Sequence, residues 1–155
     1  MIFFSKKYQR LKAAFGNLNV MREKLNCILL IDDDADDNVF HEIVIGGMNI
    51  THNIKIAKSG LEALIFLRKE NQTTLELIFL DINMPKMSGW EFLEAYHKLR
   101  LDQKAKVIVG MLTTSINPDD RKRAEQFPEI TSFNSKPLTE EMVNGILERY
   151  FPERL

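Results

Sequence analysis

The sequence predicts an α/β fold in which a parallel five-stranded sheet carries helices on both faces. Five short apolar runs alternate with segments whose apolar residues recur at helical spacing. The runs are apolar almost without interruption, as in strands covered on both sides, and strands separated by helices pair in parallel. With 155 residues, the chain has the length of one domain with a single core.

Five strands are predicted from the apolar runs. Three of the runs end abruptly in aspartate or threonine, which marks the point where each strand stops. The fifth run is less apolar than the others and gives the weakest strand signal. The predicted strands are Cys27–Ile31, Asn53–Ala57, Leu75–Leu80, Val107–Leu112 and Ile130–Ser135.

The predicted helices begin at residues that suit the N-cap position. In the first helix this residue is Asp34 or Asp36. The later helices begin with two capping boxes, an Asn-Pro pair and a threonine: Ser59 with Glu62, Ser88 with Glu91, Asn117 before Pro118, and Thr139.

Each helix needs an apolar face toward the sheet, and helical spacing predicts which residues form it. In the first helix we expect Gly46-Gly47 to act as the stop. The residues expected to face inward are Val39, Phe40, Ile43 and Val44 in the first helix; Leu61, Leu64, Ile65 and Leu67 in the second; Trp90, Leu93, Tyr96 and Leu99 in the third; and Met142, Val143, Ile146, Leu147, Tyr150 and Phe151 in the last.

Composition excludes several classes of protein. The net charge of −1 lacks the basic excess of nucleic-acid-binding proteins. The single cysteine, Cys27, rules out an internal disulfide and lies in an apolar run, which predicts a buried structural thiol in a reducing compartment. No apolar stretch approaches the ~18 residues that a membrane span requires. We therefore expect a soluble, cytoplasmic protein.

Residues 1–24 form a basic N-terminal extension before the predicted domain. Residues 1–22 hold five basic and no acidic side chains, namely Lys6, Lys7, Arg10, Lys12 and Arg22, which leaves about −6 for the rest of the chain. Phe4, Tyr8, Leu11 and Phe15 would share one face of a helix. Two interpretations are open: an amphipathic helix that docks on a membrane or partner, or a poorly ordered leader with Met21 as the natural start. We favour the second.

Polar side chains follow four of the five predicted strands. Asp32 and Asp33 follow the first, Asp81 the third, Thr113 the fourth and Lys136 the fifth. Ligands of open parallel sheets bind beyond the carboxyl ends of the strands, so these side chains are expected to converge there. Taken alone, each has an ordinary explanation as a cap, a backbone partner or a surface residue. Together they predict a site.

Charge repulsion indicates what this site holds. Two carboxylates ~5 Å apart at an effective dielectric constant of ~20 repel by about 3 kcal/mol, so Asp32, Asp33 and Asp81 need a cation. Oxygen ligands favour Mg²⁺. A carboxylate can attack phosphorus, and Asp81, in the middle of the set, is the best candidate. Lys136 and Thr113 would then contact phosphoryl oxygens.

Four motifs together resemble one family. They are ILLIDDD, LIFLDINMPKMSGWEFL, VGMLTTS and FNSKPL, in this order and at the family's spacing. The segment from Leu25 to Phe151 thereby resembles the receiver domain of two-component response regulators, and we assign residues 25–155 to that domain. The resemblance implies a flavodoxin-like (βα)5 fold, a doubly wound parallel five-stranded sheet in the order 2-1-3-4-5.

The resemblance also implies a role for each matching residue. Thr114 departs from the family, which often has Ala or Gly there, and we expect it to crowd access to the phosphoryl group. The implied roles are Asp81 as the phosphoacceptor; Asp32, Asp33, Asp81 and the backbone carbonyl of Asn83 as Mg²⁺ ligands; Thr113 and Lys136 as contacts of the phosphoryl group; and Thr113 with Phe133 as the switch pair.

By this resemblance, the chain is a stand-alone signalling switch that takes phosphate from a histidine kinase or a histidine phosphotransfer protein. The downstream target is expected on the face formed by the fourth helix, fifth strand and fifth helix, and residues 142–151 also offer a surface for a homodimer. One alternative is an aspartyl-phosphate phosphatase or hydrolase, which would carry a second carboxylate where Asn83 stands. Another is a pseudo-receiver without phosphate chemistry, which the complete set of side chains disfavours.

Overall fold

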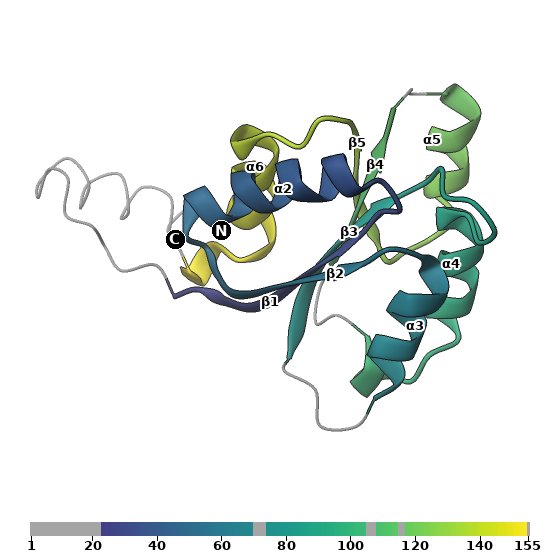
Figure 1. Cartoon of the computed structure of the whole chain (residues 1–155), viewed down its shortest axis with the longest axis horizontal. Coiled ribbons are helices and arrows are strands. Elements are labelled where there is room, and N and C mark those ends of the chain that lie inside the picture. The colour runs from purple at the N-terminus through teal and green to yellow at the C-terminus, as the bar shows by residue number, and fades with distance from the viewer. Residues whose placement is uncertain (1–22, 70–73, 105–107, 115–116, 155) are drawn as a thin grey trace, which may run out of the picture.

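The computed structural model describes residues 23–69, 74–104, 108–114 and 117–154. Val107, expected to begin the fourth strand, and nearly all of the basic extension lie outside the described residues. The strands form one parallel sheet in the order β2-β1-β3-β4-β5, which confirms the predicted fold class (Figure 1). Their bounds are β1 Leu25–Ile31, β2 Thr51–Ala57, β3 Leu75–Asp81, β4 Ile108–Thr113 and β5 Ile130–Ser135.

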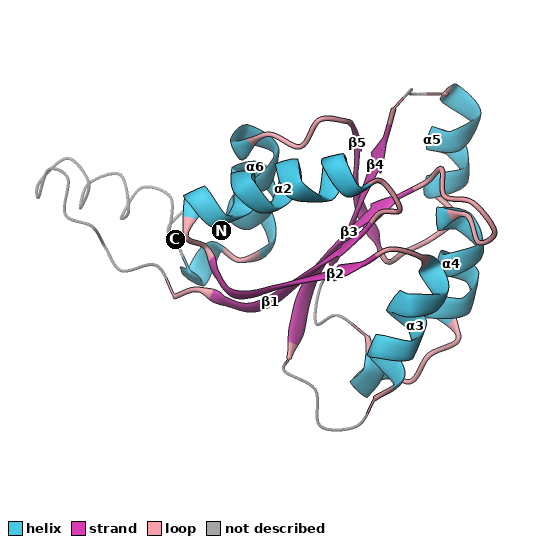
Figure 2. Cartoon of the chain, viewed as in Figure 1, coloured by secondary structure: helices cyan, strands magenta, loops and turns pink. Residues whose placement is uncertain are grey.

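The helices cover both faces of the sheet. Helices α2 and α6 lie on one face, and α3, α4 and α5 lie on the other (Figure 2). Short 3-10 turns, η1 and η2, follow α4 and α6. The bounds are α2 Ala35–Met48, α3 Gly60–Arg68, α4 Gly89–His97, η1 Leu101–Gln103, α5 Pro118–Ala124, α6 Glu140–Tyr150 and η2 Pro152–Arg154.

The inner strands divide their side chains between two apolar cores. In β1, Leu29 and Ile31 belong to the core under α3 and α4, whereas Ile28 and Leu30 belong to the core under α2 and α6. Every residue of β3 is buried. Cys27 is also buried, and burial raises the pKa of its thiol, as expected for a structural cysteine. Continuous burial explains why these strands lack polar alternation in the sequence.

Local hydrogen bonds confirm most of the predicted caps. Asp34 is the N-cap of α2 and accepts the N–H groups of Asp36 and Asp37. Ser88 forms a full capping box at α4, and Asn117 and Thr139 cap α5 and α6.

The capping box predicted at α3 is formed only in part. Ser59 accepts the N–H of Glu62, but the carboxylate of Glu62 accepts the N–H of Lys58 instead of that of Ser59. The helix therefore begins where the sequence predicts, but the hydrogen bond to the Glu62 carboxylate comes from the residue before the N-cap.

The predicted inner face of α2 is wrong. Val39, Phe40 and Ile43 are 56%, 45% and 66% exposed, while Asn38 and His41 are buried. The amide of Asn38 donates to the backbone oxygen of Asp32 at 2.8 Å, which turns the polar side of the helix toward the sheet. Buried Ile45 continues this inner face.

Two further expectations about helices are wrong. Helix α2 runs through Gly46-Gly47 and ends at Met48, and the next residue, Asn49, adopts the left-handed conformation at φ 54° and serves as the C-cap. In α3, Leu61 and Ile65 are 55% and 52% exposed. The buried side of this nine-residue helix is formed by Gly60, Ala63, Leu64 and Leu67, at helical spacing. Leu61 and Ile65 therefore face solvent.

Candidate functional site

The register of the strands brings the predicted site residues together. Ile31 of β1 pairs with Leu80 of β3, so the residues that follow them, Asp32 and Asp81, are neighbours. On the other side, Thr113 of β4 pairs with Ser135 of β5, and the N–H of Lys136 donates to the oxygen of Thr113 at 2.7 Å. The carboxyl ends of four strands thereby form one rim.

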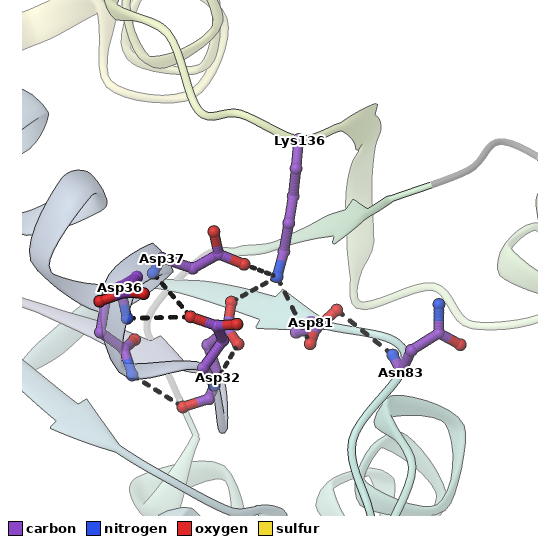
Figure 3. A network of polar contacts seen from close by, with 8 residues as sticks. Asp32, Asp36, Asp37, Asp81, Asn83 and Lys136 are labelled. Carbon is purple, nitrogen blue, oxygen red and sulfur yellow. Dashed lines mark hydrogen bonds and ion pairs between the residues drawn. The ribbon is translucent and has the colours of Figure 1, made fainter.

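Lys136 is the centre of the polar network at this rim (Figure 3). Its Nζ lies 2.6 Å from Oδ2 of Asp32 and 2.7 Å from Oδ2 of Asp37. Oδ2 of Asp81 lies farther away, at 3.5 Å. The side chain of Lys136 is only 9% exposed, so the three carboxylates surround an ammonium that has lost most of its water.

Asp81 is ionised less readily than an ordinary aspartate. Burial is the main cause, the charge of Asp32 adds to it, and together they raise the pKa of Asp81 to about 6. Lys136 and the N–H of Asn83, which donates to Oδ1 of Asp81 at 3.3 Å, oppose this rise. At pH 7 the carboxylate is therefore mostly charged, but its ionisation lowers the stability of the folded protein.

Lys136 shows the opposite balance. Burial alone would lower the pKa of its ammonium, but the hydrogen bonds to Asp32 and Asp37 and the charge of Asp81 outweigh burial and raise the pKa. The lysine therefore remains charged over the physiological range and is available to neutralise oxygen atoms bound nearby.

The donor set at the rim fits a hard divalent cation. Asp32, Asp33 and Asp81 each offer a carboxylate oxygen, and these oxygens lie within 4.8 Å of one another. Asp32 and Asp81 are buried, whereas Asp33 is exposed and open to water. Mg²⁺ takes oxygen ligands and keeps several waters, which suits two buried carboxylates beside one that faces solvent.

The loop after Asp81 passes close to its own strand. The N–H of Gly89 donates to the oxygen of Ile82 at 2.8 Å, and a Cβ at position 89 would lie 2.5 Å from the backbone oxygen of Asp81. Only glycine permits this approach. Asn83 lies in this loop, and its side chain points away from the aspartates (Figure 3).

The predicted switch residues, Thr113 and Phe133, lie on the neighbouring strands β4 and β5. Thr113 is 1% exposed at the end of β4, with exposed Thr114 next to it. Phe133 pairs with Met111 in the sheet, and the guanidinium of Arg121 on α5 lies 5.8 Å from the centre of its ring. Phe133 thus joins β5 to α5.

Asp37 was not predicted as a site residue. Its contact with Lys136 crosses 99 positions of the chain. One local signal was available: Asp37 lies in the first turn of a helix that starts at the rim, where acidic side chains are favoured.

Comparisons with known proteins agree with this geometry. Residues 28–147 match the model of the response regulator receiver domain family. The chain is 39% identical to response regulator Rcp1 of Synechocystis sp. over 97 residues, which cover 60% of this chain and 65% of that protein. It is 29% identical to two-component response regulator ARR22 of Arabidopsis thaliana over 134 residues, 84% of this chain and 87% of that protein.

A solved structure supports the same relationship. The two-component response regulator from Cytophaga hutchinsonii aligns with a TM-score of 0.75 at 29% identity, covering 84% of this chain and 99% of that one. Among the described residues, no helix is both long and apolar enough to cross a membrane.

Proposed function

Because this chain belongs to the response regulator receiver domain family, we propose that it is a signalling switch that accepts a phosphoryl group on Asp81. Receiver domains act in two-component signalling and receive their phosphoryl group from histidine kinases or histidine phosphotransfer proteins. They are signalling domains and differ from enzymes that turn over a free substrate.

One observation carries the assignment of Asp81. Its carboxylate lies 3.5 Å from the buried ammonium of Lys136 and within 4.8 Å of the oxygens of two other aspartates. An Oδ atom of Asp81 would form a bond to phosphorus as the phosphorus–nitrogen bond of a phosphohistidine breaks. The electron pair of that bond stays on the departing imidazole nitrogen.

The remaining residues position and neutralise the transferred group. Asp32, Asp33 and Asp81, with the backbone carbonyl of Asn83, would hold Mg²⁺, which supplies positive charge for the phosphoryl oxygens. Lys136 supplies a second positive charge, and the hydroxyl of Thr113 supplies a hydrogen-bond donor. The chain itself thus provides the acceptor carboxylate, one positive charge and the groups that orient the phosphoryl group.

The signal is proposed to leave through the face formed by α5, β5 and α6. A phosphoryl group adds about two negative charges, which attract Thr113 and Lys136. Phe133 follows into the space that Thr113 leaves, and its ring moves relative to Arg121. A downstream protein that prefers this packing binds the phosphorylated form more tightly.

Intact-mass spectrometry tests the assignment. The full chain is incubated with acetyl phosphate and Mg²⁺, beside Asp81→Asn and the matched control Asp102→Asn, whose side chain is 68% exposed. We expect one phosphoryl group on the wild type and the control and none on Asp81→Asn. Chelating Mg²⁺ before acetyl phosphate is added should prevent the modification.

Two outcomes would overturn the proposal. If the mass increase survives in Asp81→Asn, another residue is the acceptor. If no variant gains mass, the chain is a pseudo-receiver. Continuous release of phosphate from small esters by the wild type would instead indicate the phosphatase.

A further inference from the structure

Helix α2 exposes an apolar surface that the fold does not use. Val39 and Phe40 lie about one turn before Ile43 on its outer side, and the three side chains are 45–66% exposed. We call these three residues the α2 apolar face. The inner side holds buried Asn38 and His41 beside buried Ile45. Three apolar residues on the solvent side of a helix, with two polar residues buried on its other side, indicate that something covers the outer side.

The α2 apolar face has an acidic border. Asp36 and Glu42 are exposed on the same helix, Asp33 is exposed just before it, and the helix contains no lysine or arginine. Beyond Ile43, a Cβ at Gly46 would meet nothing within 4 Å, so that side of the helix is open. The surface therefore fits an occupant that is apolar on one side and basic at its edges.

A basic segment of this chain is attached next to this surface. The side chain of Lys24 donates to Asn49, the C-cap of α2, at 2.6 Å. The N–H of Leu25 donates to the oxygen of Ile50 at 2.8 Å. These bonds place the start of the described chain at the C-terminal end of α2, which is therefore the point where residues 1–22 are attached to the domain.

The sequence of residues 1–22 complements the α2 apolar face. It carries five basic and no acidic side chains, and Phe4, Tyr8, Leu11 and Phe15 share one side at helical spacing. As a helix, Phe4 to Phe15 would measure about 17 Å, and the 14 residues of α2 measure about 21 Å. Residues 16–22 can span up to about 23 Å, enough to bring the two helices side by side.

We propose that residues 4–15 fold back as an amphipathic helix and cover the α2 apolar face of the same chain. The aromatic residues pack on Val39, Phe40 and Ile43, and the basic residues face Asp36 and Glu42. The covered surface borders Asp33, so the helix would hinder a protein phosphodonor more than a small one. This last consequence rests on the proposed function, whereas the contact itself does not.

Paramagnetic relaxation enhancement tests the contact in the full chain. A nitroxide is attached at Ser5→Cys, because Cys27 is 1% exposed and does not react. We expect the backbone amide signals of α2 to be weaker than in the same sample after the nitroxide has been reduced. Signals of α3, which lies on the opposite face of the sheet, should keep their intensity.

A pair of matched variants makes the test specific. Ile43→Lys places a charge in the α2 apolar face, whereas Ile65→Lys places the same charge at an exposed apolar position of α3. We expect Ile43→Lys to restore the α2 intensities and Ile65→Lys to leave them reduced. Both positions face solvent, so neither substitution disturbs the core.

The contact is contradicted if α2 keeps its intensity in the labelled wild type or if Ile43→Lys changes nothing. A contact between two copies of the chain is distinguished by mixing nitroxide-labelled protein with isotope-enriched protein that carries no nitroxide. Loss of α2 intensity in that mixture would show that a second copy is the occupant and overturn the intramolecular proposal. None of these measurements needs phosphorylation, so they stand or fail independently of the role of Asp81.

Discussion

Nζ of Lys136 lies 2.6 Å from Oδ2 of Asp32, although 104 positions separate the two residues in the chain. Their contact joins the end of β5 to the end of β1 across the sheet. Because Asp81 lies between them in the strand order, this ion pair sets the electrostatic environment of the proposed acceptor. The site is therefore a balance of buried charges, and it can be perturbed one charge at a time.

Replacing Lys136 by methionine should destabilise the protein. The change leaves Asp32 and Asp37 without their cation, and breaking a buried pair in this way costs about 3 kcal/mol of unfolding free energy. Urea unfolding at pH 7 in a chelating buffer measures it. The exposed Lys58→Met is the control, and an equal loss in both variants would contradict the role of Lys136.

Asp81→Asn should stabilise the protein at neutral pH in the absence of metal. The pKa of Asp81 is raised from 3.8 to about 6 on folding. At about 1.4 kcal/mol per pKa unit, ionising it at pH 7 costs about 3 kcal/mol. The amide removes this cost.

The pH dependence of that stabilisation has a defined sign. Between pH 3.8 and about 6 the folded wild type binds more protons than the unfolded chain, so its unfolding free energy falls as the pH rises. The advantage of Asp81→Asn should grow through this window and level off above it. Urea unfolding from pH 4.5 to 7.5 checks this, and a difference that does not vary with pH would refute it.

Gly89→Ala and Gly145→Ala should have opposite effects. A Cβ at position 89 collides with the backbone of Asp81 and Ile82, so we expect a loss of about 1–3 kcal/mol. A Cβ at position 145 on α6 meets nothing, and alanine favours a helix by about 0.5–1 kcal/mol. Thermal unfolding measures both, and similar effects would contradict the close approach at Gly89.

Arg154→Met should be costly because it leaves Glu76 charged and buried. Glu76 is 0% exposed, and Nη2 of Arg154 lies 2.6 Å from its Oε1. Loss of one partner of such a pair costs about 3 kcal/mol.

A double-mutant cycle identifies the cause. Glu76→Gln combined with Arg154→Met should lose less stability than the two single variants together. Arg149→Met, which changes an exposed arginine on α6, should cost less than about 0.5 kcal/mol. Additive losses in the cycle would show that the pair contributes nothing of its own.

The order of elements and most helix starts were predictable from the sequence. Caps such as Asp34, Ser88 and Thr139 bond to N–H groups two or three residues ahead, so the whole interaction is contained in a short segment. The convergence of Asp32, Asp81 and Lys136 was also predictable, because each follows an apolar run and parallel strands end at the same edge of a sheet.

Other features depended on contacts between distant segments. The spacing of apolar residues in α2 predicted Val39, Phe40 and Ile43 as its inner side, but the bond from Asn38 to Asp32 turned the helix the other way. The contact of Asp37 with Lys136 joins residues 99 positions apart.

The sequence by itself determined which segments become strands and helices and which polar residues stand at the strand ends, because hydrogen bonds and apolar spacing over a few residues decide both. Only the tertiary structure decided how α2 is rotated, that Asp37 shares Lys136 with Asp32, and that Glu76 is neutralised by Arg154. Those outcomes depend on how buried charges and polar groups find partners across the sheet, and no local pattern records that choice.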